Sequence, residues 1–384
     1  MATETHALVS YPVDSTTFKP DWRFGSVKLL RSPKEHELKI RMVATGICHS
    51  DIVVASIPNQ PDRGLTFPKV LGHEGAGIVE AVGPGVTAAQ VGDPVILSYS
   101  HCSECDLCKV DQQPYCLNWA LLNIVGEKGH FETQADGEDA PGKFFGQSSF
   151  AGTSIVSEKS VVNLKGLVSS EDEDELKLLA PLGCGLMTGS GAVINGAGVK
   201  PHDIVLVTGL GAVGMGAIMA AKIAGCREII ALDRVAHRLE TAKELGATRV
   251  LDTTTTQQNF AEEIQKLVGG QRISVVVETT AAVPVINESL KSLGKHGKFI
   301  QLGAPGYGTE ITLPLQQFFT ENKSFECQYL GNTTGQAWVP VMIKWWREGK
   351  FPVEKIVEYF PAKEAVRAIR QMEDGTTIKP VLVW

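Results

Sequence analysis

Four cysteines lie close together in the first half of the chain, at a spacing suited to binding one metal ion. They are Cys102, Cys105, Cys108 and Cys116, with two, two and seven residues between successive members. Four thiolates complete a tetrahedral zinc site with no open position, so such a site stabilises structure and does not catalyse. A local disulfide cluster and an iron–sulfur cluster are the alternatives. The spacing favours structural zinc.

A second set of metal-binding side chains is scattered along the chain, at Cys48, His73 and Cys184. Two thiolates and one imidazole leave a tetrahedral zinc ion with one open position, as in catalytic zinc sites. Taken singly, His73 has the ordinary explanation of a packed core histidine, and Cys184 that of a small buried apolar residue. Only the three residues together indicate a catalytic metal site.

A glycine-rich turn follows the apolar run 204–208 and precedes a predicted helix, as a dinucleotide-binding fingerprint requires. The first glycine permits the tight turn, the second the close approach of a pyrophosphate, and the third close packing of helix on sheet. A glycine turn without a ligand is the alternative. The residues of this turn are Gly209, Gly211, Ala212, Val213 and Gly214.

An acidic residue, Asp233, ends the next predicted strand, nineteen residues beyond Gly214. A carboxylate there accepts hydrogen bonds from the ribose hydroxyls of the cofactor and repels a 2′-phosphate, so NAD is favoured over NADP. The neighbouring Arg234 would soften that preference.

The elements that position these residues differ between the two halves of the chain. Up to about Gly183, short β-branched runs among many Gly and Pro residues predict an irregular, mostly antiparallel β domain, with a polar surface loop over 126–142. From Asp203 to about Leu302, strands and helices alternate, which predicts a parallel sheet covered on both faces. After about Leu330 we expect two helices, 336–348 and 362–372, and a final strand over 379–384.

Composition and charge limit the possible classes of protein. The 384 residues suffice for two domains, and 43% hydrophobic with 21% charged residues is typical of a soluble globular protein. A net charge of −7 predicts no general attraction to nucleic acid or to an acidic membrane. We find no secretory signal and no apolar run of membrane-spanning length. Eight cysteines in such a chain indicate free thiols and metal in a reducing, cytoplasmic compartment.

In their order along the chain, these motifs resemble those of the zinc-dependent medium-chain alcohol dehydrogenase family. The segments 144–150 and 179–185 are most similar to its aryl-alcohol (benzyl alcohol) dehydrogenase branch. The resemblance implies a GroES-like catalytic domain split in sequence around an inserted Rossmann domain, with the active site in the cleft between them. The implied parts are 1–185, with a structural zinc lobe near 99–118, then the NAD-binding domain 186–329, and the rest of the catalytic domain, 330–384.

The resemblance also implies roles for individual residues. Cys48, His73 and Cys184 would hold the catalytic zinc, a Lewis acid that lowers the pKa of a bound alcohol. Asp51 would accept a hydrogen bond from the His73 ring. Glu74 would be either a transient fourth ligand or a buried charge beside the metal.

Further positions match a proton path and cofactor contacts in the family. Ser50 matches a hydroxyl that carries the proton away from zinc, His49 and Lys379 match contacts to the cofactor phosphates, and Thr188 matches a residue behind the nicotinamide. The histidine that ends the proton path in many members is replaced here by Val53, so the proton would leave through the cofactor ribose and water or through another base, for which His49 is the nearest candidate.

We therefore expect an enzyme with two zinc ions and NAD that interconverts a primary aromatic or conjugated alcohol and its aldehyde. Phe144, Phe145 and Tyr99 correspond to possible pocket walls, although they would equally serve as β-domain core, and Trp119 would line the pocket or cover the zinc lobe. The alternatives are a general primary-alcohol or hydroxymethyl-thiol dehydrogenase, a secondary-metabolite oxidoreductase, and a non-catalytic relative. We expect a homo-oligomer, dimer or tetramer, that binds neither nucleic acid nor membrane.

Overall fold

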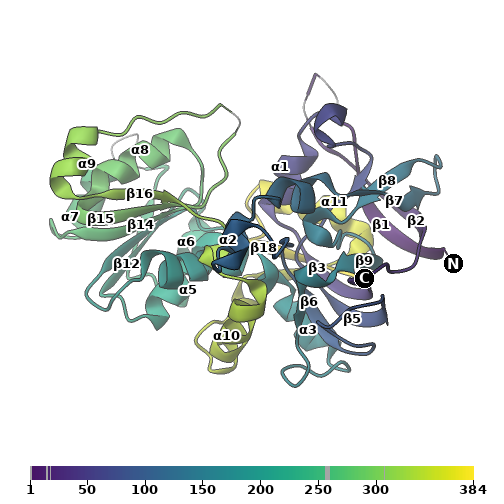
Figure 1. The fold of residues 1–384 in the computed structure, drawn as a ribbon. Coiled ribbons are helices and arrows are strands. Elements are labelled where there is room, and N and C mark those ends of the chain that lie inside the picture. Colours follow the sequence, from purple (N-terminus) through teal and green to yellow (C-terminus); the bar gives the residue numbers. More distant parts are fainter. Residues whose placement is uncertain (1, 14–15, 18, 256–259, 307) are drawn as a thin grey trace. The chain divides into compact units, whose positions relative to one another are not determined.

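The computed structural model describes residues 2–13, 16–17, 19–255, 260–306 and 308–384 (Figure 1). The chain divides into two compact units. The first contains the residues up to Cys184 together with Thr334–Ile343 and Val357–Trp384, and the second contains Gly185–Thr333 and Lys344–Ile356. Residues 330–333 and 344–356, which the sequence suggested placing with the C-terminal part, thus group with the second unit.

Two sheets build the first unit. One has the strand order β4-β1-β2-β7-β8, and the other has the order β10-β6-β5-β3-β18-β17, with β9 paired to β3. All pairings are antiparallel except that of β17 with β18. The strands are β1 (Thr3–Tyr11), β2 (Asp21–Leu29), β3 (Glu37–Gly46), β4 (Lys69–Val70), β5 (Gly75–Val82), β6 (Pro94–Leu97), β7 (Glu127–Thr133), β8 (Asp139–Gly142), β9 (Thr153–Ser157), β10 (Val161–Asn163), β17 (Val357–Pro361) and β18 (Lys379–Val383).

The helices of the first unit are short and lie at the points where the sheets turn. Because most are single turns, this unit is held mainly by sheet pairing and by its buried side chains. They are α1 (His49–Ala55), η1 (Pro61–Arg63), α2 (Asp106–Lys109), η2 (Gln113–Tyr115), η3 (Leu121–Val125), η4 (Phe144–Gly146), η5 (Glu158–Ser160), α3 (Glu173–Leu179), η6 (Ala180–Gly183), η10 (Ala362–Glu364) and α11 (Ala365–Glu373), and α10 (Gly335–Arg347) begins in this unit and ends in the second.

The prediction of a surface loop over 126–142 is wrong. This segment is the hairpin of β7 and β8, in which Phe131 pairs with Ala140 and both side chains are fully buried. Most of the polar residues that suggested a loop lie in its turn, 134–138, or are exposed at its sides, although His130 and Thr133 are buried. Two buried apolar residues in so short a hairpin are too few to give a clear alternating pattern in the sequence.

The second unit is a six-stranded parallel sheet in the order β13-β12-β11-β14-β15-β16. Its central strand β11 consists of five buried, mostly β-branched residues, as expected for a strand covered on both faces. Thr208 at the end of β11 pairs with Leu232 and with Glu278, so these three strands end at one edge of the sheet. The strands are β11 (Ile204–Thr208), β12 (Glu228–Asp233), β13 (Arg249–Asp252), β14 (Ile273–Glu278), β15 (Leu293–Gln301) and β16 (Ser324–Cys327).

Helices cover both faces of this sheet. Figure 1 shows α7, α8 and α9 on one face and α5 and α6 on the other. Phe260, Ile264 and Leu290 of the first group pack with Leu206, Leu232 and Phe299 of the strands in one apolar core. The helical segments are α4 (Gly185–Gly191), η7 (Ala192–Ala197), α5 (Ala212–Ile223), α6 (Ala236–Leu245), α7 (Phe260–Leu267), α8 (Val283–Ser292), α9 (Leu315–Glu321), η8 (Leu330–Asn332) and η9 (Val353–Lys355).

The predicted series of alternating strands and helices is confirmed, with ends that shift by a few residues. The helix predicted over 259–268 is α7, and its predicted first residue, Asn259, lies outside the described residues. Within the part of the chain that the structure describes, no single helix is long and apolar enough to cross a membrane, and one bent pair of consecutive helices within 173–197 meets the test by length and composition alone.

Candidate metal centres and cofactor site

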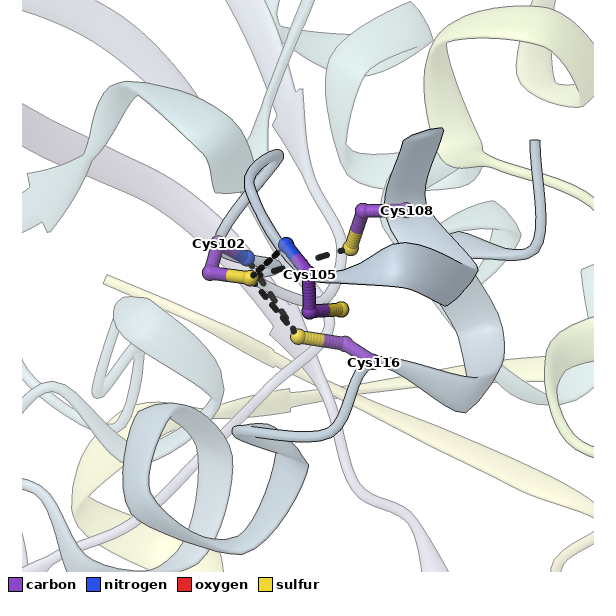
Figure 2. Close-up of side chains that lie close together, drawn as sticks. All are labelled: Cys102, Cys105, Cys108 and Cys116. Carbon is purple, nitrogen blue, oxygen red and sulfur yellow. Dashed lines mark hydrogen bonds between the residues drawn. The ribbon is translucent and has the colours of Figure 1, made fainter. Parts of the chain in front are cut away.

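The four clustered cysteines turn their sulfur atoms toward a common centre (Figure 2). The four Sγ atoms all lie within 4.8 Å of one another, with Cys102 at 3.5 Å from Cys116 and 3.9 Å from Cys108. Four sulfurs at zinc-bond length around one ion would be about 3.8 Å apart. A disulfide would bring two sulfurs to about 2.05 Å. All four thiols are free, and their arrangement fits a single tetrahedral ion.

The loop that carries these cysteines also supplies backbone donors to their sulfur atoms. The N–H of Glu104 and that of Cys105 point at Cys102 Sγ, at 3.5 and 3.3 Å. These hydrogen bonds lower the pKa of the Cys102 thiol to about 6. Leu117 N donates to Cys105 Sγ in the same way, at 3.5 Å. The loop therefore favours the thiolate form, which binds metal, at Cys102 and Cys105, whereas burial raises the pKa of the Cys108 and Cys116 thiols.

The second donor set is assembled from three distant segments of the first unit. Ligand atoms of Cys48, His73, Glu74 and Cys184 lie within 4.8 Å of one another. His73 is fully buried, and its Nε2 atom has no hydrogen-bond partner among the described residues. A buried ring nitrogen without a partner is costly unless it binds something, so this atom fits a metal ligand. With two thiols and an acceptor nitrogen converging, the residues present suit zinc.

Asp51 orients the histidine of this set. Its Oδ1 atom lies 2.8 Å from His73 Nδ1 and also accepts from the backbone N–H of Gly72 at 3.1 Å. Its Oδ2 atom accepts from Cys48 N, at 3.0 Å, just before α1 begins. Although burial disfavours a charged ring, the Asp51 carboxylate raises the pKa of His73 well above its usual value. Asp51 thus joins the segments of two ligands.

Glu74 forms a buried ion pair that the sequence did not suggest. Its Oε2 atom accepts from Lys379 Nζ at 2.7 Å, and that ammonium also donates to Ile47 O at 2.8 Å. Burial raises the pKa of Glu74 to about 7, against the opposing effect of the Lys379 ammonium. A Cβ atom at position 46 would lie 2.1 Å from Glu74 Oε2, which explains the glycine there. The Lys379 ammonium is thus buried beside the metal ligands, and its contact to a cofactor phosphate stays a prediction.

An aromatic cluster surrounds the His73 ring. Phe145 stacks on it with 4.4 Å between ring centroids and 24° between planes, and Phe144 meets it edge-on at 5.6 Å. Trp119 contacts Phe145 edge-on at 5.8 Å, and Tyr99 lies 5.3 Å from Trp119. Phe144 has no exposed surface, Tyr99 almost none and Phe145 little, so all three pack as core residues do, and their role as pocket walls stays a prediction.

The glycine turn of the second unit has the geometry of a phosphate-binding loop. Gly209 has φ +83°, in the left-handed region, and a Cβ on Gly214 would lie 1.9 Å from Gly209 O. A Cβ on Gly211 would meet nothing within 4 Å, so the backbone is open to close approach there. Gly211 caps α5, whose N-terminal N–H groups and dipole favour an anion. The residues present fit a dinucleotide pyrophosphate.

Asp233 stands beside this loop at the end of β12. Its Oδ2 atom accepts from Leu210 N at 2.7 Å, and Oδ1 accepts from Arg234 N and Val235 N at 2.7 and 2.9 Å. The carboxylate therefore fixes the glycine turn while its oxygens keep further lone pairs for ribose hydroxyls. The Arg234 side chain is exposed.

The remaining predicted residues lie at or near the start of short helices. Ser50 is half-buried with its Oγ atom 3.9 Å from Cys48 Sγ, and His49 is exposed at the first position of α1. Val53 is exposed on the same helix. Thr188 is half-buried in α4 of the second unit.

The sequence analysis missed Gln147. This fully buried amide bonds to the backbone on both sides of Glu74. An amide side chain inside the mostly apolar segment 144–150 was the available signal, because a buried amide needs partners.

The fold and these donor sets define an oxidoreductase that uses zinc and a dinucleotide. Residues 34–165 match the sequence family described as alcohol dehydrogenase GroES-like domain, and residues 212–346 match the family described as zinc-binding dehydrogenase. The chain belongs to the zinc-dependent medium-chain alcohol dehydrogenase family, and it is an NAD-dependent zinc alcohol dehydrogenase.

Individual relatives agree over 71% to 99% of this chain. A geraniol dehydrogenase of Castellaniella defragrans is 32% identical over 92% of each chain. A probable alcohol dehydrogenase of a Pseudomonas species is 37% identical over 71% of this chain and 84% of its own. The crystal structure of benzyl alcohol dehydrogenase from Acinetobacter calcoaceticus superposes with a TM-score of 0.88 at 32% identity and covers 99% of both chains.

Proposed function

We propose that this dehydrogenase interconverts a primary aromatic or conjugated alcohol and its aldehyde. The observation that carries the proposal is the Phe145 ring stacked on His73, because the substrate oxygen must reach the metal that His73 serves. Phe145 and Trp119 then offer flat apolar surface next to the reacting carbon. Two of the relatives act, by their names, on benzyl alcohol and on geraniol, which are aromatic and allylic primary alcohols.

The proposed roles at the metal follow from the geometry. Cys48, His73 and Cys184 would hold a zinc ion, which would supply a Lewis acid that favours loss of the alcohol proton, and NAD would supply the hydride acceptor. Asp51 keeps a proton on His73 Nδ1, so Nε2 is free to bind. Ser50, half-buried beside Cys48, takes the alcohol proton outward, and Glu74 balances the Lys379 charge.

At the cofactor, His49 and Lys379 were expected to contact phosphates and Thr188 to support the nicotinamide. We propose that the exposed His49 ring contacts a cofactor phosphate. For Lys379, whose ammonium bonds to Glu74 and Ile47, we favour a role at the metal. Asp233, bonded to the glycine turn, is the proposed ribose acceptor that favours NAD over NADP.

We further propose that the chain forms a homo-oligomer in a reducing, cytoplasmic compartment. All eight cysteines are free, as a reducing compartment would keep them. The edge strand β16 and the exposed apolar residues Leu315 and Phe319 of α9 lie close together in sequence and suit pairing with a second copy of the chain.

The substrate proposal is tested by measuring NADH formation from benzyl alcohol and from ethanol, alongside the zinc content of each subunit. We expect two zinc ions and a kcat/KM for benzyl alcohol at least about tenfold above that for ethanol, since the flat ring gains apolar contact in the pocket. Faster turnover of ethanol would show that the aromatic assignment is wrong. Fewer than two zinc ions would contradict one of the metal sites.

Two variants distinguish a phenylalanine that contacts substrate from one that only packs in the core. Phe145→Leu should reduce the preference for benzyl alcohol, whereas Phe131→Leu, which alters a buried phenylalanine of β7, should leave the preference unchanged.

A further inference from the structure

The side chain of Gln147 holds the backbone around a predicted zinc ligand. Its Nε2 atom donates to His73 O at 3.0 Å and to Ser98 O at 2.6 Å, and its Oε1 atom accepts from Gly75 N at 3.2 Å. Both amide hydrogens and the amide oxygen are therefore used, and the residue has no exposed surface. The strand β5 begins at Gly75, so Gln147 fixes the point where the ligand segment enters the sheet.

The local backbone forces this side chain inward. Lys143, Phe145 and Ser148 all have positive φ, at 62°, 52° and 52°, which side-chain-bearing residues adopt only when surrounding contacts demand it. Ser148 Oγ accepts from Phe144 N and donates to Val70 O, which closes the turn. The same turn thus presents Phe145 to the His73 ring and Gln147 to the His73 backbone.

Ser98 extends the connection to another ligand. Its backbone oxygen accepts from Gln147, and its Oγ atom donates to Gly183 O at 2.7 Å. Gly183 immediately precedes Cys184, and a Cβ at Gly183 would lie 2.1 Å from Leu97 O. A continuous set of hydrogen bonds therefore runs from the His73 segment through Gln147 and Ser98 to the Cys184 segment. Asp51 provides the corresponding link between His73 and Cys48.

We propose that Gln147, acting through Ser98, is a positioning residue that sets the separation of His73 and Cys184 and so the affinity of the catalytic site for zinc. The inference rests on the proposed function only in placing zinc between these two ligands. Tetrahedral coordination tolerates little displacement, and loss of residues that orient ligands typically weakens metal binding 10- to 100-fold. Gln147 itself does not touch the metal ligand atoms through its hydrogen bonds, which go to backbone groups.

The test compares Gln147→Met, which keeps length but removes every hydrogen bond, with Gln147→Glu, which keeps shape but places carboxylate oxygens against two carbonyls. Gln336→Met is the control for the loss of an amide bridge at an exposed position, because Gln336 Nε2 also bridges two carbonyls of the first unit, Lys159 O and Val161 O, at 3.0 Å each. Zinc release from each purified holoenzyme to the chelator 4-(2-pyridylazo)resorcinol is followed in time, together with the visible spectrum after cobalt replaces the faster-released zinc.

In both Gln147 variants we expect one zinc ion to be released about tenfold or more faster than in the parent, the second at the parent rate, and the cobalt bands to shift. The kcat value should fall while the KM for NAD stays nearly constant. The Gln336 variant should match the parent in all readouts. A folded Gln147→Met protein with parental release rates and an unchanged cobalt spectrum would overturn the proposal.

Ser98→Ala keeps the test decisive if the Gln147 variants do not fold, since it removes only the bond to Gly183. Faster release of one zinc ion from that variant supports the connection, and parental release contradicts it. These readouts do not depend on substrate. If the variants release one zinc ion faster but the parent does not oxidise aromatic alcohols, the positioning role is upheld and the substrate proposal is rejected. If the parent contains only the zinc ion of the cysteine cluster, both proposals are rejected.

Discussion

At the scale of single residues, the two metal-ligand sets differ in what surrounds their thiols. Cys105 lies on a surface loop, where backbone N–H groups support the sulfurs. Cys184 is buried among His73, Glu74 and the Lys379 ammonium. Neighbouring charges at the second site suit a reacting centre, whereas backbone donors at the first only hold four thiolates in place.

This difference predicts separate effects of removing one ligand from each set. Cys184→Ala should abolish turnover and leave the melting temperature within a few degrees of the parent. Cys105→Ala should lower the melting temperature by several degrees or more, because a structural zinc contributes folding free energy. Calorimetry and turnover measured on both proteins check this division of roles. Equal losses of stability in the two variants would contradict it.

The two clusters of candidate ligands could be predicted from the sequence because cysteine and histidine are rare and their chemistry is specific, and the structure brings each cluster together. The partners of those ligands could not be predicted. Gln147 lies 37 residues before Cys184, and Lys379 lies 195 residues after it. Both reach the site only through the folded sheet, and an amide or an ammonium has many ordinary surface roles. Asp51 was predictable only through the family resemblance.

At the scale of elements, a network of charges ties together the strands that carry the aromatic turn. Glu37 at the start of β3 accepts from Arg31 at 2.6 Å and from Lys143 at 2.6 Å, and Glu127 of β7 pairs with Arg31 and Lys34. Lys143 directly precedes η4, which contains Phe144 and Phe145. Although burial opposes it, hydrogen bonds from Arg31 and Lys143 lower the pKa of Glu37 to about 2.

A pKa that falls on folding stabilises the folded state above the unfolded value and loses that contribution as pH falls toward the folded value. For Glu37 the shift from 4.5 to about 2 corresponds to roughly 3 kcal/mol, reduced to about 1–2 kcal/mol by partial solvent screening. Glu37→Gln should therefore be less stable than the parent by about that amount at pH 7, and the difference should shrink between pH 4.5 and pH 2.

Urea unfolding of both proteins across this pH range measures the difference. Glu240→Gln serves as the control, because Glu240 forms an exposed pair with Lys243 on α6 and should change stability little at any pH. If the difference in free energy of unfolding between the parent and Glu37→Gln stayed constant down to pH 3, the charge network could not be the source of that difference.

The elements of the second unit were predictable because each strand is a buried apolar run and each helix is bounded by turns. The first unit was harder. Its β7–β8 hairpin was mistaken for a loop, and β17 (Val357–Pro361) has a mixed exposed and buried pattern that carries no clear period. Pairing with distant strands, not local preference, makes these segments strands.

At the scale of the whole molecule, the exposed edge of the second unit bears on assembly. Phe319 is 85% exposed and Leu315 is 78% exposed on α9, which is separated by two residues from the edge strand β16. Large apolar side chains beside an unpaired edge favour association with a like surface.

Phe319→Glu should therefore shift the protein toward monomers, since a charge cannot be buried in an apolar contact without a large cost. Sedimentation velocity of the parent and the variant measures the change. Tyr359→Glu, a charge introduced at an exposed aromatic of the first unit, is the control and should keep the parental assembly. An unchanged oligomer in the Phe319 variant would place the interface elsewhere.

The two donor sets also close chain loops of very different length. The cysteine cluster spans 14 positions, whereas 136 positions separate Cys48 from Cys184, and the Lys379 ammonium arrives only with the last strand. Closing the longer loop costs roughly 2 kcal/mol more chain entropy. During synthesis the cysteine loop is complete at Cys116, whereas the second donor set is complete only at Cys184 and gains the Lys379 partner of Glu74 only with the last strand, so we expect the cysteine cluster to bind its ion first.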